Sequence, residues 1–565
     1  MAKPSLPLIG ASVALWCLIA SVDAQRPEGL QLSASPPRDE VAKTGTAIIR
    51  GRVVAADTGK PIRWASVSLT SPQLTERRAA LTDEQGRYEL TALPAGTYTL
   101  NASKETFISL AYGQTRPAQA GRPLSIADKQ IVEKVDFLLP RGGVISGRLY
   151  DELGDPVVNI TVTAMRSQFG QGKRQLVRAG ASSTTNDLGE YRLYGLQPGR
   201  YYVSATMRFP GGAVEAPRSG FAPSYYPGTT SFAEAQPVTV GLAQTLTGID
   251  VRLAPVRTAS VSGIIVDTEG HPLAAANVNL IEHGPANDKG VSFTVAKPDG
   301  SFTLSGVPPG HYSVDAVSTI ATTAKRPALG DSGRATEPIA VDGVDVTGLR
   351  MSTQRLSGAT GRISFDPPSA ALAARLLHIG TLPVNPAESQ LFAFEARIDA
   401  DLTFDLQVPP GSMMLTAYQL PPGWMMKAVR VAGRDVIDSG LEFKPGERVD
   451  DFEIELTNRV PIVQGKVHDA KGTPVDDYAV LVFSQHREQW SDRRARYVAV
   501  ARPDQAGTFT VATLPPGDYY VIALDYVDQN DAADPALLER LANDAVRVSL
   551  TDGETKTLDL KRQAE

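Results

Sequence analysis

Histidines would most readily carry metal or acid–base chemistry in this chain, and they form no catalytic pattern. The sequence has six, and none is followed three residues later by the glutamate that a His-x-x-Glu zinc site requires. The nearest approach, His486-Arg487-Glu488, has the wrong spacing. We therefore expect surface and turn roles, and no metal site, for His271, His283, His311, His378, His468 and His486.

A serine nucleophile is the second chemistry to consider, because Gly330-Asp331-Ser332-Gly333 resembles the nucleophile loop of trypsin-like proteases. Such a serine needs a histidine base and an aspartate that orients it. Arg334 stands where a further glycine is usual, and no histidine segment matches. No phosphate-binding glycine loop or dinucleotide fingerprint follows a strand. The sequence predicts neither catalytic residues nor a cofactor, so we expect the protein not to be an enzyme.

Aspartates recur in two series of turns along the chain. Clustered carboxylates and loop carbonyls are the ligands that Ca²⁺ prefers, so calcium sites are one interpretation. An aspartate shortly before a glycine is also the usual sequence of a turn closed by its own side chain. We expect structural turns, with calcium as the alternative, at Asp57, Asp155, Asp267 and Asp469 in one series and at Asp83, Asp187, Asp299 and Asp504 in the other.

Exposed aromatic side chains could stack on sugar rings and so bind a polysaccharide. The candidates outside the repeated pattern are Trp424, Trp490, Tyr225 and Tyr226, with Trp64 as a further one. Arg493 and Arg494 follow Trp490, and we expect the 493–496 cluster to be a solvated loop. A polysaccharide or protein partner at the loop ends is therefore the binding expectation.

The elements that would position these residues are organised around one repeated turn. It reads LPAGTY at 93–98 and returns as LQPGRY at 196–201, VPPGHY at 307–312 and LPPGDY at 514–519, with a degenerate VPPGSM at 408–413. Proline fixes φ and glycine supplies positive φ, as a hairpin turn requires. The tyrosine after the turn should pack inward and bond its hydroxyl to backbone. Five turns about 100 residues apart predict five copies of one small domain.

Each copy contains about seven short alternating segments with turn signals between them. This pattern predicts an all-β fold of five Greek-key β-sandwiches, with one short helix at 534–543 in the last. An aspartate cap, a first-turn proline and leucines 537, 538 and 541 on one side support that helix. Residues 371–378 also look helical. The expected repeats are one (46–140), two (141–255), three (256–354), a degenerate four (355–457) and five (458–565).

Together these motifs resemble carboxypeptidase regulatory-like domains, which have a transthyretin-like sandwich related to the Cna-B repeats of bacterial surface proteins. The shared features are a glycine in the opening strand, an Asp-x-x-Gly-x-Pro turn, a small-x-Val-x-Leu second strand and the Pro-Gly-x-Tyr turn. The resemblance covers nearly all of 46–562 and also extends to tandem secreted proteins of soil bacteria, especially acidobacteria. Cna-B relatives often carry a lysine isopeptide bond from the first strand. Only Lys466 is available here, so we expect no such bond.

The amino terminus predicts export. A basic start, an apolar core and small residues at positions 22 and 24 indicate a signal peptide over 1–24, cleaved between Ala24 and Gln25, followed by a flexible leader over 25–45. Cys17, the only cysteine, lies in the signal. No second stretch of about 18 apolar residues follows, so we expect no transmembrane segment in the mature chain. A net charge of −6 argues against a nucleic-acid partner.

The sequence therefore favours a secreted, non-catalytic protein of the periplasm, cell surface or exterior, acting as a spacer, adhesin or ligand-binding protein. The alternative is a carbohydrate- or peptide-binding accessory of a hydrolase or of an outer-membrane uptake system.

Overall fold

The computed structural model describes residues 45–563, except 72–73, 75–76, 117, 171, 208–218, 284–288, 319–332, 369–376, 386–394, 419, 421–422, 493 and 495. Several expectations lie outside these described residues. They are the signal peptide with its cleavage site at Ala24 and Gln25, Cys17, nearly all of the leader, most of the helix expected at 371–378, and Asp331 and Ser332 of the serine string.

Repeat one shows the common plan of two facing sheets. Its first sheet joins β1 (Ala47–Ala55) antiparallel to β4 (Arg87–Leu93) and parallel to β8 (Ile131–Val132) and β9 (Phe137–Leu139). Its second sheet contains β2 (Ser66–Thr70), β3 (Arg78–Leu81), β5 (Gly96–Ser103), β6 (Leu110–Ala111) and β7 (Leu124–Ile126). Alternate residues of β1 and β5 point inward, and Ile49, Val67 and Leu100 pack between the sheets. The alternation predicted from the sequence is thus the burial pattern.

Repeats two and three follow the same plan. In repeat two the first sheet has β10 (Gly143–Tyr150), β14 (Glu190–Leu196), β19 (Thr245–Leu246) and β20 (Val251–Arg252), and the second has β11 (Ile160–Gly170), β12 (Lys173–Arg178), β13 (Ser183–Thr184), β15 (Gly199–Met207), β17 (Ser224–Tyr225) and β18 (Val238–Val240). A small ladder pairs β16 (Ser219–Phe221) with β21 (Pro255–Arg257). In repeat three the sheets are β22 (Ala259–Val266), β25 (Ser301–Val307) and β28 (Val346–Ser352), facing β23 (Asn277–Glu282), β24 (Lys289–Val295), β26 (Gly310–Ser318), β27 (Gly333–Val341) and β29 (Gln354–Arg355).

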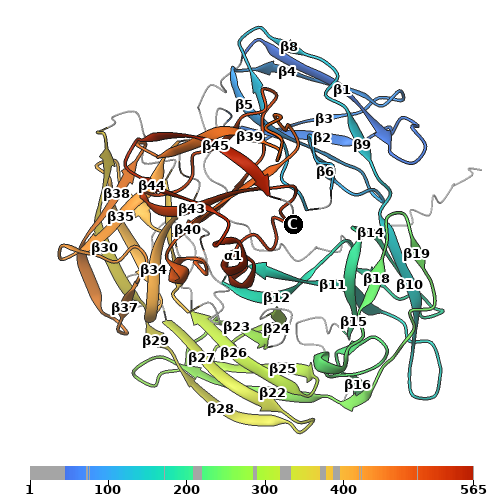
Figure 1. Cartoon of the computed structure of the whole chain (residues 1–565). Helices are drawn as coiled ribbons and strands as arrows, with labels where there is room; N and C mark the ends of the chain where they lie inside the picture. The colour runs from blue at the N-terminus through green and yellow to red at the C-terminus, as the bar shows by residue number, and fades with distance from the viewer. Residues whose placement is uncertain are drawn as a thin grey trace, which may run out of the picture. The chain divides into compact units, whose positions relative to one another are not determined.

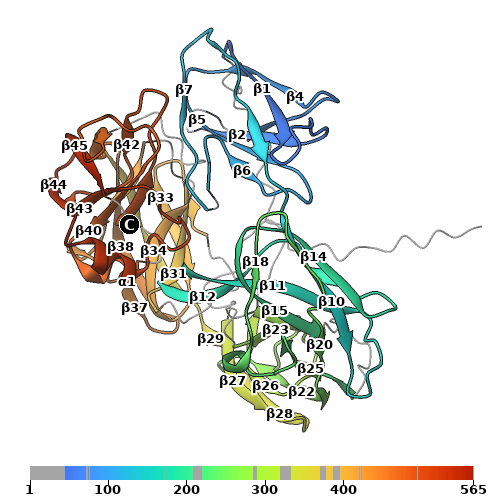
Figure 2. The same cartoon turned by 45° about the vertical axis from the view of Figure 1, so that its right-hand side comes forward.

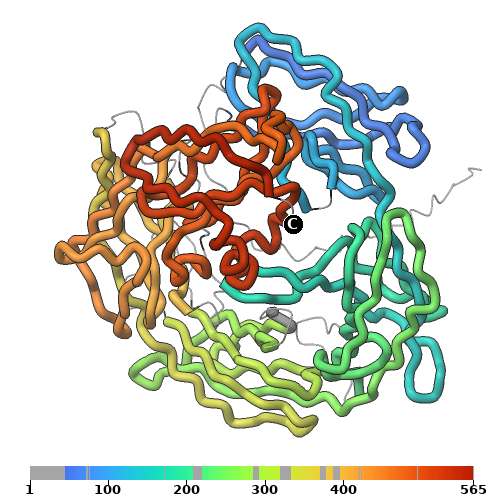
Figure 3. Tube along the Cα trace, viewed as in Figure 1, coloured from blue at the N-terminus to red at the C-terminus, as the bar shows by residue number. Residues whose placement is uncertain are grey.

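Repeats four and five enlarge the plan. Repeat four has a six-stranded sheet of β30 (Ser357–Asp366), β32 (Arg397–Ile398), β33 (Thr403–Val408), β35 (Met425–Val431), β36 (Arg434–Asp435) and β38 (Arg448–Thr457), with β31 (His378–Pro383), β34 (Gly411–Tyr418) and β37 (Leu441–Phe443) in the other. Repeat five has β39 (Ile462–His468), β40 (Ala479–Ser484), β41 (Val498–Ala501), β42 (Phe509–Val511), β43 (Gly517–Leu524), β44 (Val546–Leu550) and β45 (Thr555–Gln563). The predicted all-β class is confirmed, and each repeat occupies its own stretch of the chain in Figures 1 and 3.

The opening-strand glycines have a packing role in every repeat. A Cβ atom on each would lie about 2 Å from a carbonyl oxygen just before or within the closing strand, which no side chain tolerates. The pairs are Gly51 with Val135 (1.9 Å), Gly147 with Ile249 (2.1 Å), Gly263 with Leu349 (2.2 Å), Gly361 with Phe452 (2.0 Å) and Gly465 with Leu558 (1.8 Å). First and last strands pair in parallel in all five repeats, and glycine lets them approach.

The tyrosine after the repeated turn packs inward, as predicted. Tyr98, Tyr201, Tyr312 and Tyr519 are buried, and each hydroxyl donates to the carbonyl four residues earlier. The Tyr312 hydroxyl, for example, donates to Pro308 O at 3.0 Å. In the degenerate repeat four, the buried Met413 takes the tyrosine's place in the motif and has no hydroxyl to donate.

Repeat five carries a second apolar layer on the outer face of one sheet. Helix α1 (Pro535–Leu541) begins after Asp534, whose carboxylate caps Ala536 N, and it buries Leu538 and Leu541. These leucines pack with Leu481, Phe483 and Ile522 from β40 and β43. Figure 2 shows α1 beside these strands. All six residues of β40 are buried, because both of its faces are covered. The predicted helix is confirmed and ends at Leu541.

Candidate functional site

Most of the recurring aspartates close turns that are repeated along the chain. Asp83 Oδ1 accepts hydrogen bonds from the backbone N–H groups of Gln85 (2.9 Å) and Arg87 (2.8 Å), and the Arg87 hydrogen bond holds the pKa of Asp83 below its usual value. The same two-bond pattern closes the turns at Asp151, Asn186, Asp267, Asp469 and Asp504. In repeat two the capping residues are therefore Asp151 and Asn186, in place of the expected Asp155 and Asp187. Asp57 instead pairs with Arg141 at 2.8 Å.

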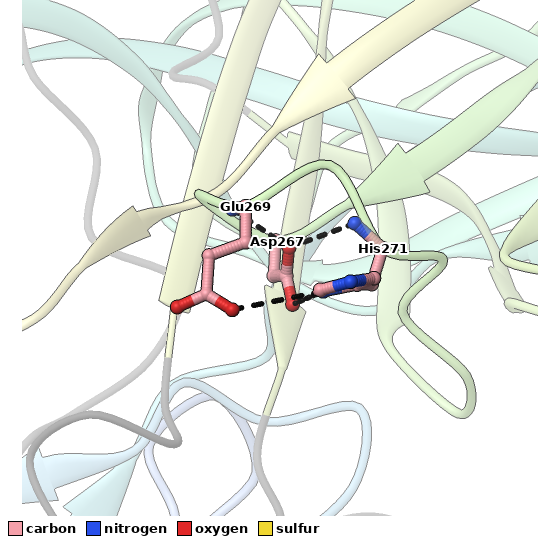
Figure 4. A group of neighbouring side chains, drawn as sticks. All are labelled: Asp267, Glu269 and His271. Atoms are coloured by element: carbon pink, nitrogen blue, oxygen red, sulfur yellow. Dashed lines mark hydrogen bonds and ion pairs between the residues drawn. The ribbon is translucent and has the colours of Figure 1, made fainter.

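One of these turns brings together a potential cation-binding group, shown in Figure 4. Asp267, Glu269 and His271 of repeat three place one ligand atom each within 4.8 Å of one another. His271 Nδ1 lies 3.4 Å from Asp267 Oδ2 and 3.7 Å from Glu269 Oε2. Asp267 Oδ1 is already occupied by Glu269 N (2.8 Å) and His271 N (2.9 Å), and these backbone bonds lower the pKa of Asp267, the His271 bond most. Within the described ranges this is the one such group.

The geometry of this group is that of an ordinary turn. Its histidine and glutamate are well exposed, so water competes for every ligand position, and Glu269 also pairs with Arg355 at 3.2 Å. A calcium site would draw on more oxygen ligands than the two carboxylates present. The cluster is a weak candidate for a divalent cation and carries no catalytic arrangement.

The remaining described histidines do not converge. His283 contacts Ser313 Oγ at 2.9 Å, His378 lies 3.5 Å from Glu395, and His468 pairs with Asp559 across neighbouring strands. His486 precedes the 3₁₀ turn Arg487–Gln489. Each belongs to local packing or to the surface.

The four expected stacking aromatics do not form a shared exposed surface, and for Trp490 the expectation of exposure is wrong. Trp490 is 5% exposed, packs against Phe483 at 5.8 Å between ring centroids, and donates from Nε1 to Ser484 O at 2.7 Å. Its place is in the second core of repeat five, and the all-apolar run 478–483 was the signal for that core. Trp424 packs edge-on against Phe365 at 5.2 Å.

The tyrosines are also engaged within repeat two. Tyr225 packs edge-on against Phe232 at 5.6 Å, and burial raises its pKa. Tyr226 packs against the core of the repeat. Trp64 differs from all of these, because it is 62% exposed and has a φ of 58°. A bulky residue is rare at positive φ, so Trp64 is the aromatic presented to solvent at some backbone cost.

The expectation of a solvated loop at 493–496 is wrong for its two described arginines. Arg494 is 8% exposed and donates to Ile437 O and to Asp438 at 2.7 Å each. Arg496 reaches Asp438 at 3.0 Å and Met426 O at 3.1 Å. Both arginines of repeat five thus pair with repeat four. Arg493 lies outside the described residues.

Cavities among the described residues include two possible binding places. A polar one of about 280 Å³ is lined mainly by repeat two, including Arg166, Arg178, Gln197 and Tyr201. A second is an open groove of about 780 Å³ over the first sheet of repeat one, lined by Arg50, Arg52, Glu89, Glu133 and neighbours. Neither brings together a nucleophile with a base and a group to orient it, so neither supports a catalytic mechanism.

No helix in the described parts of the chain is both long and apolar enough to cross a membrane.

Comparison with known proteins agrees with this geometry. The sequence-family model of the carboxypeptidase regulatory-like domain matches residues 48–127, 144–254 and 260–348. A TonB-dependent transporter, Oar of Myxococcus xanthus, is 34% identical over 82 residues, which are 14% of this chain and 8% of the transporter. The chain thus spans only a small part of that relative.

Solved structures that resemble the chain include pilins. A streptococcal ancillary pilin aligns over 55% of this chain and 99% of its own at 13% identity and a TM-score of 0.20. The minor pilin of Streptococcus agalactiae aligns over 37% of this chain and 95% of its own, with the same identity and TM-score. The family assignment rests on the three matched segments and on the repeated strand and turn geometry. Residues 48–127, 144–254 and 260–348 are therefore carboxypeptidase regulatory-like domains in tandem.

Proposed function

We propose that this protein is an exported, non-catalytic array of five β-sandwich domains with the boundaries given above, which separates or presents binding surfaces outside the cytoplasm. The observation that supports this best is the use of its recurring polar residues. The repeated aspartates close turns, and the repeated tyrosine hydroxyls bond to backbone. The polar side chains that recur between copies therefore stabilise the scaffold, which leaves loops and sheet edges to vary.

Location is tested by labelling and by sequencing. N-terminal sequencing should show that the mature protein begins at Gln25. Antibody or added protease should reach the protein on whole cells after any outer membrane has been permeabilised. The full-length chain retained in the cytoplasm, with residues 1–24 uncleaved, would contradict the proposal.

A carbohydrate-binding accessory role is the second candidate, favoured by the exposure of Trp64. Binding of the mature chain to a panel of insoluble polysaccharides should then fall about 5- to 30-fold in Trp64→Ala, since one stacked ring contributes about 1–2 kcal/mol. Trp490→Phe is the matched control, because that ring is buried. Flat binding to every polysaccharide would remove this candidate and leave the spacer role standing.

An accessory role at an outer-membrane uptake system belongs with this candidate. The 82-residue similarity to a transporter supports it only as a shared domain. Co-purification of the protein with an outer-membrane receptor from envelope extracts is the corresponding test.

A further inference from the structure

Two insertions that distinguish repeats two and five carry opposite charges. Repeat five places four aspartates at three-residue intervals between β43 and α1, and we call residues 525–534 the acidic insertion. Repeat two extends β11 to 11 residues, compared with 5 for β2 and 6 for β23 at the same place. The extended β11–β12 hairpin carries Arg166 and Arg174.

These insertions contact each other. Asp531 Oδ1 accepts from Phe169 N at 2.9 Å and lies 3.5 Å from Arg174. Arg174 also pairs with Asp534, and Arg166 lies 3.5 Å from Asp528. Every aspartate used here is more than 300 residues away in sequence from its partner, so the chain itself does not impose the pairing.

Repeat five contacts repeat one through a second set of polar bonds. Arg122 donates to Pro503 O at 3.1 Å and to Asp504 O at 2.8 Å. The Gln505 side chain accepts from Ser125 N and donates to Ser125 O, each at 3.3 Å.

Arg502 makes the reciprocal contact and is the most buried arginine of the set. Its side chain is 1% exposed, and it donates to Gly113 O at 2.6 Å and to Ala120 O at 3.2 Å. It also pairs with Asp477 within repeat five. A buried guanidinium is tolerated only where carbonyl and carboxylate oxygens meet its donors, and repeat one supplies two of them.

We propose that repeat five is an intramolecular docking domain, which holds repeats one and two of the same chain through the acidic insertion and through the exchange of Arg122 and Arg502. Complementary charge on two unrelated insertions is what such a contact requires. The side chains in the ion pairs of the acidic insertion are 15–50% exposed, so salt should weaken the docking and make it reversible. This inference does not depend on which ligand the protein binds.

Cross-linking of the mature full-length chain tests the docking. Cysteines introduced as Ser125→Cys and Gln505→Cys should join within one chain through a short bis-maleimide. Joining should slow about tenfold when Asp528→Asn and Asp531→Asn are added, because two ion pairs and a charge-assisted bond are weakened. Glu84→Gln with Asp187→Asn is the matched control, since both sites are exposed and no hydrogen bond or ion pair of their side chains is among the contacts described.

Three results would overturn the proposal. They are equal joining rates in the charge variant and its control, joining only between two chains, or no joining in a chain whose circular dichroism is that of the folded protein. If a variant fails to fold, small-angle scattering of the unsubstituted chain provides the test instead. Its radius of gyration should rise between 50 mM and 1 M NaCl, and an unchanged radius would equally contradict reversible docking.

Discussion

At the scale of single residues, glycine and tyrosine define the repeat for opposite steric reasons. The opening-strand glycine is needed because a carbonyl oxygen occupies the place of its missing side chain. The turn tyrosine is needed because it fills the core while its hydroxyl satisfies a turn carbonyl. In repeats one and two a further tyrosine hydroxyl reaches the carbonyl beside the glycine, from Tyr88 to Val135 O and from Tyr191 to Ile249 O.

Replacing one opening-strand glycine should separate its two strands. Gly263→Ala would place a methyl group about 2 Å from Leu349 O, so we expect a loss of about 2–4 kcal/mol in repeat three. Hydrogen exchange of peptides covering 259–266 and 346–352 would measure it.

Gly270→Ala is the control in the same repeat. Unlike Gly263, this glycine has a positive φ of 88°, but only the end of Arg350 lies near its added Cβ atom, so the cost should be about 1 kcal/mol. Equal losses in the two variants would contradict the close-approach explanation.

The buried tyrosines predict a specific response to alkali. Burial raises the pKa values of Tyr201, Tyr312 and Tyr519, and that of Tyr478 to about 12. A raised folded-state pKa means that the stabilisation is complete below the unfolded value of about 10 and is lost as pH rises through the folded value. Absorbance at 295 nm should therefore show exposed tyrosines ionising near pH 10 and these tyrosines ionising only together with unfolding. Full ionisation of all tyrosines in the folded protein would contradict this.

At the scale of elements, the second core of repeat five shows how the pattern of residues in a strand changes when a helix covers its outer face. Where one sheet face meets solvent, a strand alternates apolar and polar residues, as β1 does. β40 is buried throughout, and apolar from Ala479 to Phe483, because α1 and Trp490 cover its outer face. A tryptophan beside two arginines therefore belonged to packing, although its sequence neighbours suggested exposure.

Two tryptophan substitutions should have opposite effects. Trp490→Ala removes a buried ring and should cost about 3–5 kcal/mol, with faster hydrogen exchange in 479–484 and 535–541. Trp64→Asn should gain about 1 kcal/mol, because asparagine tolerates positive φ and occupies the corresponding turn position in repeat two as Asn159. Thermal unfolding of the full chain compares them, and a destabilised Trp64→Asn would refute the interpretation of backbone strain.

At the scale of the whole described chain, adjacent repeats are joined by charge as well as by linkers. Lys427 of repeat four lies 3.0 Å from Asp366, 3.3 Å from Glu455 and 3.0 Å from Asp552, and Asp552 belongs to repeat five. Arg494 and Arg496 add bonds to Asp438. These bonds oppose independent motion of repeats four and five.

Acid should weaken this junction, because Asp366 pairs with Lys427 of repeat four and also lies 3.7 Å from Arg459 of repeat five. The Lys427 hydrogen bond holds the pKa of Asp366 below its usual value. The stabilisation that ionised Asp366 contributes is therefore present above about pH 4 and is lost as pH falls through the folded-state pKa. Hydrogen exchange in 425–431 and 551–555 should accelerate below that pH, after correction for the intrinsic rate.

Asp366→Asn should reproduce this opening at pH 7, while the exposed Glu453→Gln on β38 should not. Unchanged exchange in Asp366→Asn would show that the Asp366 carboxylate does not stabilise the junction.

The sequence by itself determined the class of fold, because that depends on local rules. Alternation of apolar residues, the Pro-Gly turns and the aspartate turns act over a few residues and recur in each copy. They predicted the sandwich, the buried turn tyrosines and helix α1. The aspartate cap of α1 followed from the same short-range logic.

Only the tertiary structure decided which side chains face solvent and which repeats meet. Exposure of Trp490 or Trp64 depends on what lies over each ring, and the covering residues come from other elements. Arg494 and Arg502 each have partners in another repeat, in the case of Arg502 nearly 400 residues away. Contacts at such separations are set by the packing of folded units, and no local pattern in the sequence carries them.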